Sequence, residues 1–384
     1  MALNCFSDFS LSSLNPKSSF YDTDFGPILS SRQGEQFARH LNDPKIAIMT
    51  EWDKVIGHEW AVSLLEATIH HDRIGHAYLI TGPAQIGKST LARTFAQAVN
   101  CTADLLSERP CGQCRACTLI EAGRHPDLRL VSGEVTPRGI TTLKIDQIRQ
   151  LQHELSLTAT EARYKVAIVE QFESANQNAA NAFLKTLEEP PKNVILILTA
   201  ADADTLLPTI SSRCQNIGLR LVPTSLIKRS LVTDWQVPDD EARLYAHLAD
   251  GRIGWAINVA QAPELLQLRD SHLKSLYEAL DNKRVGRFAL AEKLSRKPES
   301  LPEMLRTWLS WWHDLALLFI NRNYAERLTN IDQQSIISDK VLAYQSGEVF
   351  SSLTKTSQAI WQLGRNANSR LVIENLLLHY PKVH

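Results

Sequence analysis

The sequence predicts an α/β fold with a parallel sheet, followed by a second part built from helices alone. Between about residues 77 and 200, apolar strand-like runs alternate with amphipathic helical segments, which is typical of βαβ units. The runs 164–169 and 194–199 are almost wholly apolar, as expected of parallel strands that are covered on both faces. Beyond about Val222 the strand pattern disappears and the spacing of apolar residues becomes helical.

The limits of the elements follow from the same patterns. We expect strands over 77–80, 128–131, 164–169 and 194–199, and helices over 60–70, 91 to about 100, 145–155, 176–188, 225–232, 241–248, 254–260, 263–280 and 301–321. Pro190 and Pro191 end the helix before them, because neither can continue it. A cluster of tryptophans in the last of these helices lies among Leu and Ile without interleaved basic residues, so we expect core or subunit packing rather than base stacking.

Composition excludes several classes of protein. The chain has 384 residues, 44% of them hydrophobic and 22% charged, which is enough for two or three domains with cores of their own. Lys and Arg number 41 against 42 for Asp and Glu, so no global field draws the chain onto nucleic acid. No uncharged apolar run approaches the ~18 residues of a membrane-spanning helix. We find no secretory signal and expect a cytoplasmic protein.

The first 48 residues lack a domain-like pattern and are rich in Ser. Met49 comes directly before the first segment that has such a pattern, Glu51–Gly57. We therefore expect residues 1–48 to be a disordered extension, or translation to start at Met49.

A phosphate-binding loop lies between the first strand and the helix after it. Residues 82–89 match G-x-x-x-x-G-K-[ST] and Thr90 follows them; the assigned residues are Gly82, Gly87, Lys88, Ser89 and Thr90. The glycines permit a tight turn whose N–H groups converge on one anion. Lys88 is expected to reach the β- and γ-phosphates of ATP, and the Ser89 hydroxyl to ligate Mg²⁺. We also assign Thr199, the last residue of its strand, to the nucleotide site.

The element that would activate water for hydrolysis is incomplete. A P-loop enzyme needs an acidic pair after the strand beside the P-loop strand, and here the run 166–169 is followed by Glu170 and Gln171. Glu170 can reach a metal ion through water and is assigned as a weak catalytic residue. The amide of Gln171 cannot act as a base at neutral pH. Glu173 is assigned to the segment that follows, so the pattern predicts nucleotide binding with weak or absent hydrolysis.

Four cysteines have the spacing of a metal site rather than of a disulfide framework. The pattern C-x9-C-x2-C-x2-C comprises Cys101, Cys111, Cys114 and Cys117. Four thiolates complete a tetrahedral Zn²⁺ site with no open position, so the ion would be structural. A set of reduced thiols without metal is the alternative. An iron–sulfur cluster is disfavoured because nothing else in the chain indicates redox chemistry.

These motifs together resemble the clamp-loader subunits of bacterial DNA polymerase III. The resemblance runs from about Trp52 to Leu219 and is carried by the segments His76–Pro83, the four-cysteine insertion, Asn181–Pro191 and Ser212–Cys214. It implies an AAA+ module, in which a P-loop α/β domain over 49–221 carries the zinc module 101–117. A small helical lid over 222–284 and an all-α collar domain over 285–384 would follow.

Within this family the chain resembles the delta-prime subunits more than the gamma/tau motor subunits. The motor has a complete Asp-Glu pair where this chain has Glu170 and Gln171, and an Arg in the lid where this chain has Gly254. The intact P-loop departs from many delta-prime subunits, and it leaves ATP binding open.

The resemblance also implies a role for Arg213, a residue that by position alone would be an ordinary surface charge. In the five-subunit loader, with its motor (gamma/tau) and delta subunits, the matching Arg enters the ATP site of a neighbouring motor subunit. The assembled ring opens the sliding clamp and loads it on primed DNA. Three alternatives stay open: an active motor subunit, a stand-alone P-loop enzyme of nucleotide metabolism, and a scaffold whose P-loop is a relic.

Overall fold

The computed structural model describes residues 51–135, 141–365 and 367–381. The expected extension 1–48 and the possible start at Met49 lie outside the described residues. Within the described ranges, each helix is too short or too polar to traverse a lipid bilayer.

A five-stranded parallel sheet forms the centre of the α/β part. Its strand order is β2-β5-β6-β1-β7, and the strands are β1 (Ala77–Thr81), β2 (Leu128–Val131), β5 (Lys165–Val169), β6 (Val194–Ala200) and β7 (Gln215–Gly218). Strands β1, β5 and β6 are buried along their whole length, which confirms the expectation for the apolar runs. Strand β1 pairs with β6 on one side and β7 on the other. Because β6 lies between β1 and β5, the strand before Glu170 is not the direct neighbour of the P-loop strand, which corrects the expectation from the sequence.

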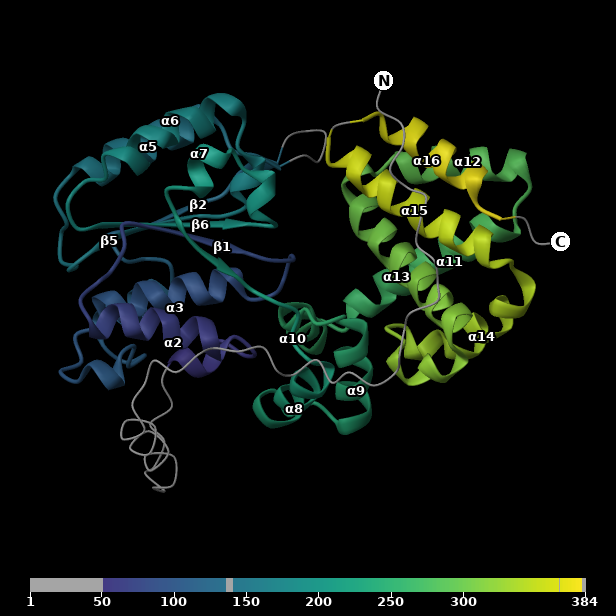
Figure 1. The fold of residues 1–384 in the computed structure, drawn as a ribbon, viewed down its shortest axis with the longest axis horizontal. Helices are drawn as coiled ribbons and strands as arrows, with labels where there is room; N and C mark the ends of the chain where they lie inside the picture. The colour runs from purple at the N-terminus through teal and green to yellow at the C-terminus, as the bar shows by residue number, and fades with distance from the viewer. Residues whose placement is uncertain (1–50, 136–140, 366, 382–384) are drawn as a thin grey trace, which may run out of the picture. The chain divides into compact units, whose positions relative to one another are not determined.

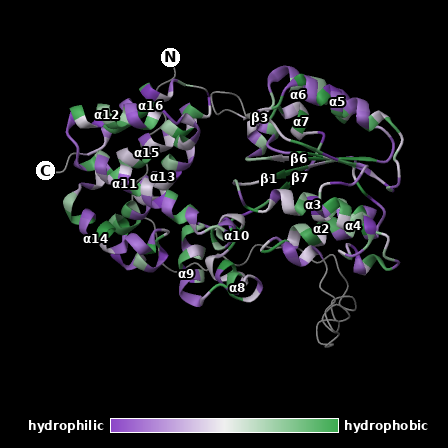
Figure 2. Cartoon of the chain, turned by 180° about the vertical axis from the view of Figure 1, so that it is seen from behind, coloured by the Kyte–Doolittle hydropathy of each residue, from purple (hydrophilic) through white to green (hydrophobic). Residues whose placement is uncertain are grey.

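Helices cover both faces of this sheet (Figure 1). One face carries α2 (Glu59–His70) and α3 (Lys88–Asn100), and the other carries α5 (Ile145–Ser156), α6 (Gln177–Glu188) and α7 (Pro208–Ser211). Figure 2 shows the sheet between a layer with α5 and α6 and a layer with α2 and α3. Each face has its own hydrophobic core: Phe95 packs edge-on against Tyr78 of β1 on the first, and Phe183 packs against Phe172 on the second.

Some elements were not predicted from the pattern. They are β7, α7, α4 (Arg115–Glu121) and the hairpin of β3 (Glu134–Val135) with β4 (Thr141–Thr142). Strand β7 buries only Ile217 fully, so it lacks the apolar run that marks the other strands. Short 3-10 turns connect the longer elements: η1 (Glu51–Lys54), η2 (Leu106–Glu108), η3 (Phe172–Ser174), η4 (Ala203–Thr205), η5 (Pro298–Ser300), η6 (Arg322–Arg327) and η7 (Ile331–Gln333).

Three helices follow the sheet and belong to its first core. They are α8 (Thr224–Asp234), α9 (Asp239–Leu248) and α10 (Ile253–Gln261). Leu231, Ala246 and Val259 are buried in the same hydrophobic cluster as Leu65 of α2. The lid-like helices are thus packed onto the P-loop side of the α/β part.

The remaining helices form a separate core. They are α11 (Glu264–Asp281), α12 (Arg284–Ser295), α13 (Leu301–Ile320), α14 (Gln334–Ala343), α15 (Ser346–Leu363) and α16 (Ser369–His379). Trp308, Trp311 and Trp312 of α13 have no exposed surface, and the rings of Trp311 and Trp312 meet edge to face with centroids 5.0 Å apart. The tryptophan cluster is therefore core, and it offers no platform to a nucleic-acid base.

Candidate nucleotide site and four-cysteine cluster

The loop after β1 has the backbone of a phosphate cradle. Gly87 adopts a φ of +109° at the residue before α3, a conformation that L side chains rarely take, and α3 starts at Lys88. The first N–H groups of this 13-residue helix have no partner inside the helix, so they are directed at whatever lies in front of it. That end of the helix favours an anion.

Lys88 is held inside the loop that it follows. Its ammonium donates to the carbonyl oxygens of Gly82 and Pro83, the second at 2.8 Å. Burial lowers the pKa of Lys88, and the negative charge of Glu173 acts in the opposite direction. A partly desolvated cation beside a helix N-terminus is suited to a phosphate group.

One open pocket brings the predicted nucleotide residues together. Its lining contains Gly87, Lys88, Ser89, Thr90, Glu170 and Thr199, whereas Gly82 begins the loop without lining the pocket. These residues fit a nucleotide with Mg²⁺: Lys88 and the N–H groups of α3 would hold phosphate, and the Ser89 hydroxyl would hold the ion. A bound Mg²⁺ would supply charge neutralisation at the phosphates.

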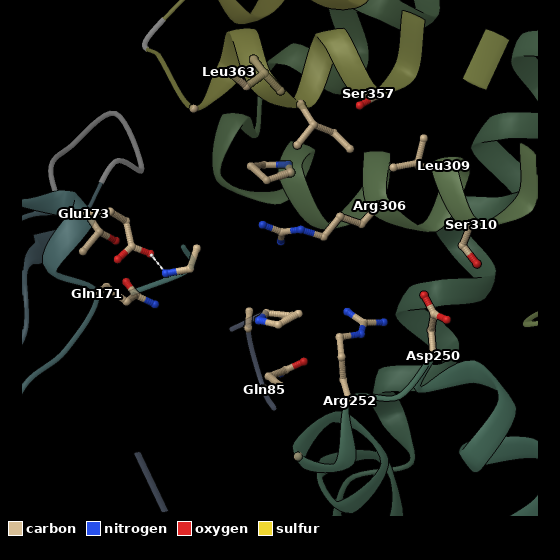
Figure 3. A pocket seen from close by; sticks show the side chains of 18 of the residues that line it. Gln85, Gln171, Glu173, Asp250, Arg252, Arg306, Leu309, Ser310, Ser357 and Leu363 are labelled. Carbon is tan, nitrogen blue, oxygen red and sulfur yellow. Dashed lines mark hydrogen bonds between the residues drawn. The ribbon is translucent and has the colours of Figure 1, made fainter. Parts of the chain in front are cut away.

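The residues after β5 bring an amide, from Gln171, and a carboxylate, from Glu173, to this pocket. Gln171 has a φ of +52°, and its N–H donates to the Thr199 hydroxyl at 3.1 Å. Figure 3 shows the Gln171 amide directed into the pocket, where a water-activating carboxylate would be needed. Glu173 lies in η3 and accepts a hydrogen bond from the Ala201 N–H at 3.2 Å.

Glu173 is a site residue that the sequence reasoning missed. Its carboxylate lines the same pocket as Lys88 and is the charge that acts on that ammonium. The sequence carried one signal for it, a second acidic residue shortly after the end of β5. Only the turn at η3 brings that residue back to the pocket.

Helix α10, which we assign to the lid, contacts the P-loop directly. The N–H of Gly254 in α10 donates to the Gln85 carbonyl at 2.8 Å. A Cβ at position 254 would lie 2.8 Å from the same oxygen, so glycine permits this approach of the two backbones. The lid Arg expected of a motor subunit could not stand at this position without moving the helix.

Arg252, at the residue before α10, also lines the pocket and was not predicted. Its Nε–H donates to the Ala249 carbonyl at 2.9 Å. Burial lowers the pKa of its guanidinium, with Arg306 adding to that effect and Asp250 opposing it. Figure 3 shows Arg252 reaching into the pocket from the side opposite Gln171.

Arg213 lies elsewhere, just beyond α7, which ends at Ser211. It does not line the pocket that contains Lys88. Its guanidinium donates to the Thr209 carbonyl at 2.8 Å and pairs with a Glu188 carboxylate oxygen at 2.9 Å. The Arg213 side chain is 37% exposed, so it is accessible on the surface of the isolated chain.

The four predicted cysteines converge. The Sγ atoms of Cys101, Cys111, Cys114 and Cys117 all lie within 4.8 Å of one another. Sulfurs around a tetrahedral Zn²⁺ with bonds of about 2.3 Å are about 3.8 Å apart, and the Cys101 and Cys114 sulfurs are 3.9 Å apart. The cluster therefore fits a zinc ion, which would join the end of α3 to the start of α4.

The surroundings shift the pKa values of these thiols in different directions. Burial raises the pKa of Cys101 and of Cys117. Burial also opposes ionisation of Cys114, but hydrogen bonds from Thr102 and Cys117 outweigh it and lower the pKa of Cys114 to about 6. Because metal ligands must be thiolates, a bound cation would supply the charge that stabilises the two buried ones.

The family follows from the geometry and from comparison with known proteins. A P-loop at the end of a buried strand of a parallel sheet, with helix α10 packed against the loop, defines a P-loop protein. A family model described as "DNA polymerase III, delta subunit" matches residues 57–223. The DNA polymerase III subunit delta′ of Bacillus subtilis is 30% identical over 321 residues, which are 83% of this chain and 94% of that protein. The chain belongs to the DNA polymerase III delta-prime subunit family.

Further relatives and solved structures extend the comparison. The delta′ subunit of Pseudomonas aeruginosa is 44% identical over 144 residues, 36% of this chain and 41% of that protein. A crystal structure of a gamma-subunit-related protein from Thermotoga maritima is similar with a TM-score of 0.41 and 18% identity, covering 83% of this chain and 99% of that one. The RuvB Holliday junction branch migration motor of Thermotoga maritima is similar with a TM-score of 0.38 and 17% identity, over 54% of this chain and 62% of that one.

Proposed function

We propose that this chain is the delta-prime subunit of a DNA polymerase III clamp loader and helps to load the sliding clamp onto primed DNA. Its partners would be the motor (gamma/tau) and delta subunits of a five-membered ring. The observation that carries the proposal is a complete P-loop whose pocket has Gln171 in place of a water-activating carboxylate. Such a subunit holds ATP and Mg²⁺ but leaves hydrolysis to its neighbours.

Arg213 acts in a neighbour's active site. It is the residue of this chain that matches the arginine finger, it is accessible, and it lies outside this chain's own nucleotide pocket. A guanidinium inserted beside the γ-phosphate neutralises the charge that develops there in the transition state. Loss of such a finger lowers the rate at the affected site by ~10³–10⁵-fold.

The reconstituted loader tests this role. Arg213→Ala should leave folding, metal content and ATP binding by this chain intact, while the rate of clamp loading falls. Arg213→Lys should restore little, because a point charge does not reproduce the planar fork of a guanidinium. Arg229→Ala, at an exposed cation of α8 that has no ion pair among the described residues, is the matched control. Full clamp loading by a ring that contains Arg213→Ala would refute the finger.

We also propose the domain limits and the metal. The divisions at 221/222 and 284/285 separate the α/β domain, the lid and the collar, with α11 as the connection. Leu265 and Leu266 of α11 pack on the first core, while Leu273 and Leu276 belong to the second. The ion of the cysteine cluster is Zn²⁺ with a structural role, supported by the closed set of four sulfurs.

One observation favours a second candidate, an active motor subunit. Glu173 places a carboxylate in the pocket with Lys88 and Ser89, where it could polarise water in place of Gln171. ATP turnover by the isolated chain that is lost in Glu173→Gln would establish this candidate. Absence of turnover in the wild-type chain would exclude it.

A further inference from the structure

The C-terminal end of α6 faces Arg213. Glu188 is the last residue of α6, and α7 lies beside that helix in Figure 1. One carboxylate oxygen of Glu188 is 2.9 Å from the NH2 nitrogen of Arg213. The next residue, Glu189, has no ion pair among the described residues, although it is equally acidic and also exposed.

The helix itself does not account for a carboxylate at this position. The C-terminal end of a helix carries partial negative charge, which disfavours Glu there. Pro190 and Pro191 fix the end of α6 at this residue, because they cannot continue the helix. The guanidinium of Arg213 lies opposite this helix end and gives the Glu188 carboxylate a partner of opposite charge. We therefore relate the position of Glu188 to Arg213.

Two contacts on different nitrogens orient the Arg213 guanidinium. NH2 faces Glu188, and NH1 donates at 2.8 Å to the carbonyl of Thr209 in α7. A guanidinium is planar, so two anchored nitrogens fix its plane. It carries five N–H donors, and these two contacts leave donors for a phosphate.

We propose that Glu188 is a positioning residue for Arg213, which it holds in the orientation that a neighbouring subunit's ATP site requires. This inference rests on the proposed function of Arg213. In the isolated chain the pair is exposed, and the Glu188 side chain is 52% exposed, so solvent screening makes the contribution of the pair to folding stability small. Between two subunits water is excluded, and the attraction becomes stronger where the finger acts.

The test uses the reconstituted loader with four versions of this subunit beside wild type. They are Glu188→Ala, Glu189→Ala as the matched control, Arg213→Ala, and the double variant Glu188→Ala/Arg213→Ala. Glu188→Ala should lower clamp loading roughly tenfold and lower the kcat of the DNA-stimulated ATPase without raising the KM for ATP, because misplacement of a catalytic group affects the chemical step. Glu188→Gln, which keeps the length of the side chain, replaces Glu188→Ala if that variant fails to fold or assemble.

The double variant separates positioning from an independent role. If Glu188 acts through Arg213, the double variant should load clamps as slowly as Arg213→Ala alone, because effects within one unit are not additive. A further loss in the double variant would overturn the inference, as would Glu188→Ala behaving like Glu189→Ala or loading faster than wild type. If Arg213→Ala itself loads at the wild-type rate, the proposed finger fails and this inference fails with it.

Discussion

Lys88 and Gln171 line one pocket but serve different steps of ATP chemistry. Lys88, the helix N-terminus behind it and the Ser89 hydroxyl are suited to holding phosphate and metal. Gln171 supplies an amide where a base would be needed. Binding and hydrolysis can therefore be lost separately.

We expect the isolated chain to bind Mg²⁺-ATP and Lys88→Ala to lose most of this binding. Removal of the ammonium leaves the terminal phosphates without their charged partner inside a partly desolvated loop. A fluorescent-nucleotide titration measures the effect, with an expected rise in Kd of at least about tenfold, the cost of one charge-assisted contact. Lys192→Ala, at an exposed lysine just before β6, is the control and should bind as wild type does. Wild-type protein that binds no nucleotide would make the P-loop a structural remnant.

At the scale of single residues, the sequence predicts the residues of the P-loop but not the residues that other parts of the fold bring to the same pocket. Gly87, Lys88 and Ser89 follow from a contiguous motif whose spacing encodes its own geometry. Glu173 and Arg252 reach the pocket only through the fold of η3 and of the lid. No local pattern marks a residue whose partner lies far away in the sequence.

At the scale of elements, the four-cysteine cluster joins α3 to α4, a helix with little apolar surface of its own. Helix α4 has seven residues and buries only Cys117 and Ile120. The connection from α3 to α4 is fastened to η1 through the Trp52 indole, which donates to the Arg109 carbonyl at 3.0 Å. A metal ion would supply the stability that this short segment cannot gain from a core.

We expect the purified protein to contain about one Zn²⁺ per chain and the Cys114→Ser/Cys117→Ser variant to contain none. Metal analysis and thermal unfolding are the measurements, and the variant should unfold at a lower temperature. Acidification should release the ion from the wild type, because protons compete for the thiolates. Cys214→Ser removes a cysteine outside the cluster and should leave the zinc content unchanged. Equal zinc in the double variant would contradict the assignment.

The elements predicted from the sequence are those with a strong period. The apolar runs of β1, β5 and β6 and the helices α5 and α6 were found to within a residue or two. Strand β7 was not, because Gln215, Asn216 and Gly218 have no strand-like character and the strand forms only through its pairing with β1. Helix α7 has four residues, too few for a helical period to be visible.

At the scale of the whole molecule, the described residues form three hydrophobic cores, and two of them show how the lid and the C-terminal helices are held. One contains the P-loop helix, a face of the sheet and the lid; the other contains the tryptophans of α13 and the C-terminal helices. The change from strands to helices near Val222 was visible in the sequence. The sharing of one core by the lid and the sheet was not, because the periodicity of a helix shows that it has an apolar face but not what covers that face.

The hydrogen bond from Gly254 to Gln85 joins the lid to the P-loop through backbone atoms alone. The amide proton of Gly254 can exchange with solvent deuterium only when the lid moves away from the loop and this hydrogen bond breaks. No side chain takes part in the contact, and a larger residue at position 254 would not fit it. The rate at which this one amide acquires deuterium therefore measures how often the lid opens, and its change on addition of ATP reports whether the nucleotide closes the subunit or leaves its motion unchanged.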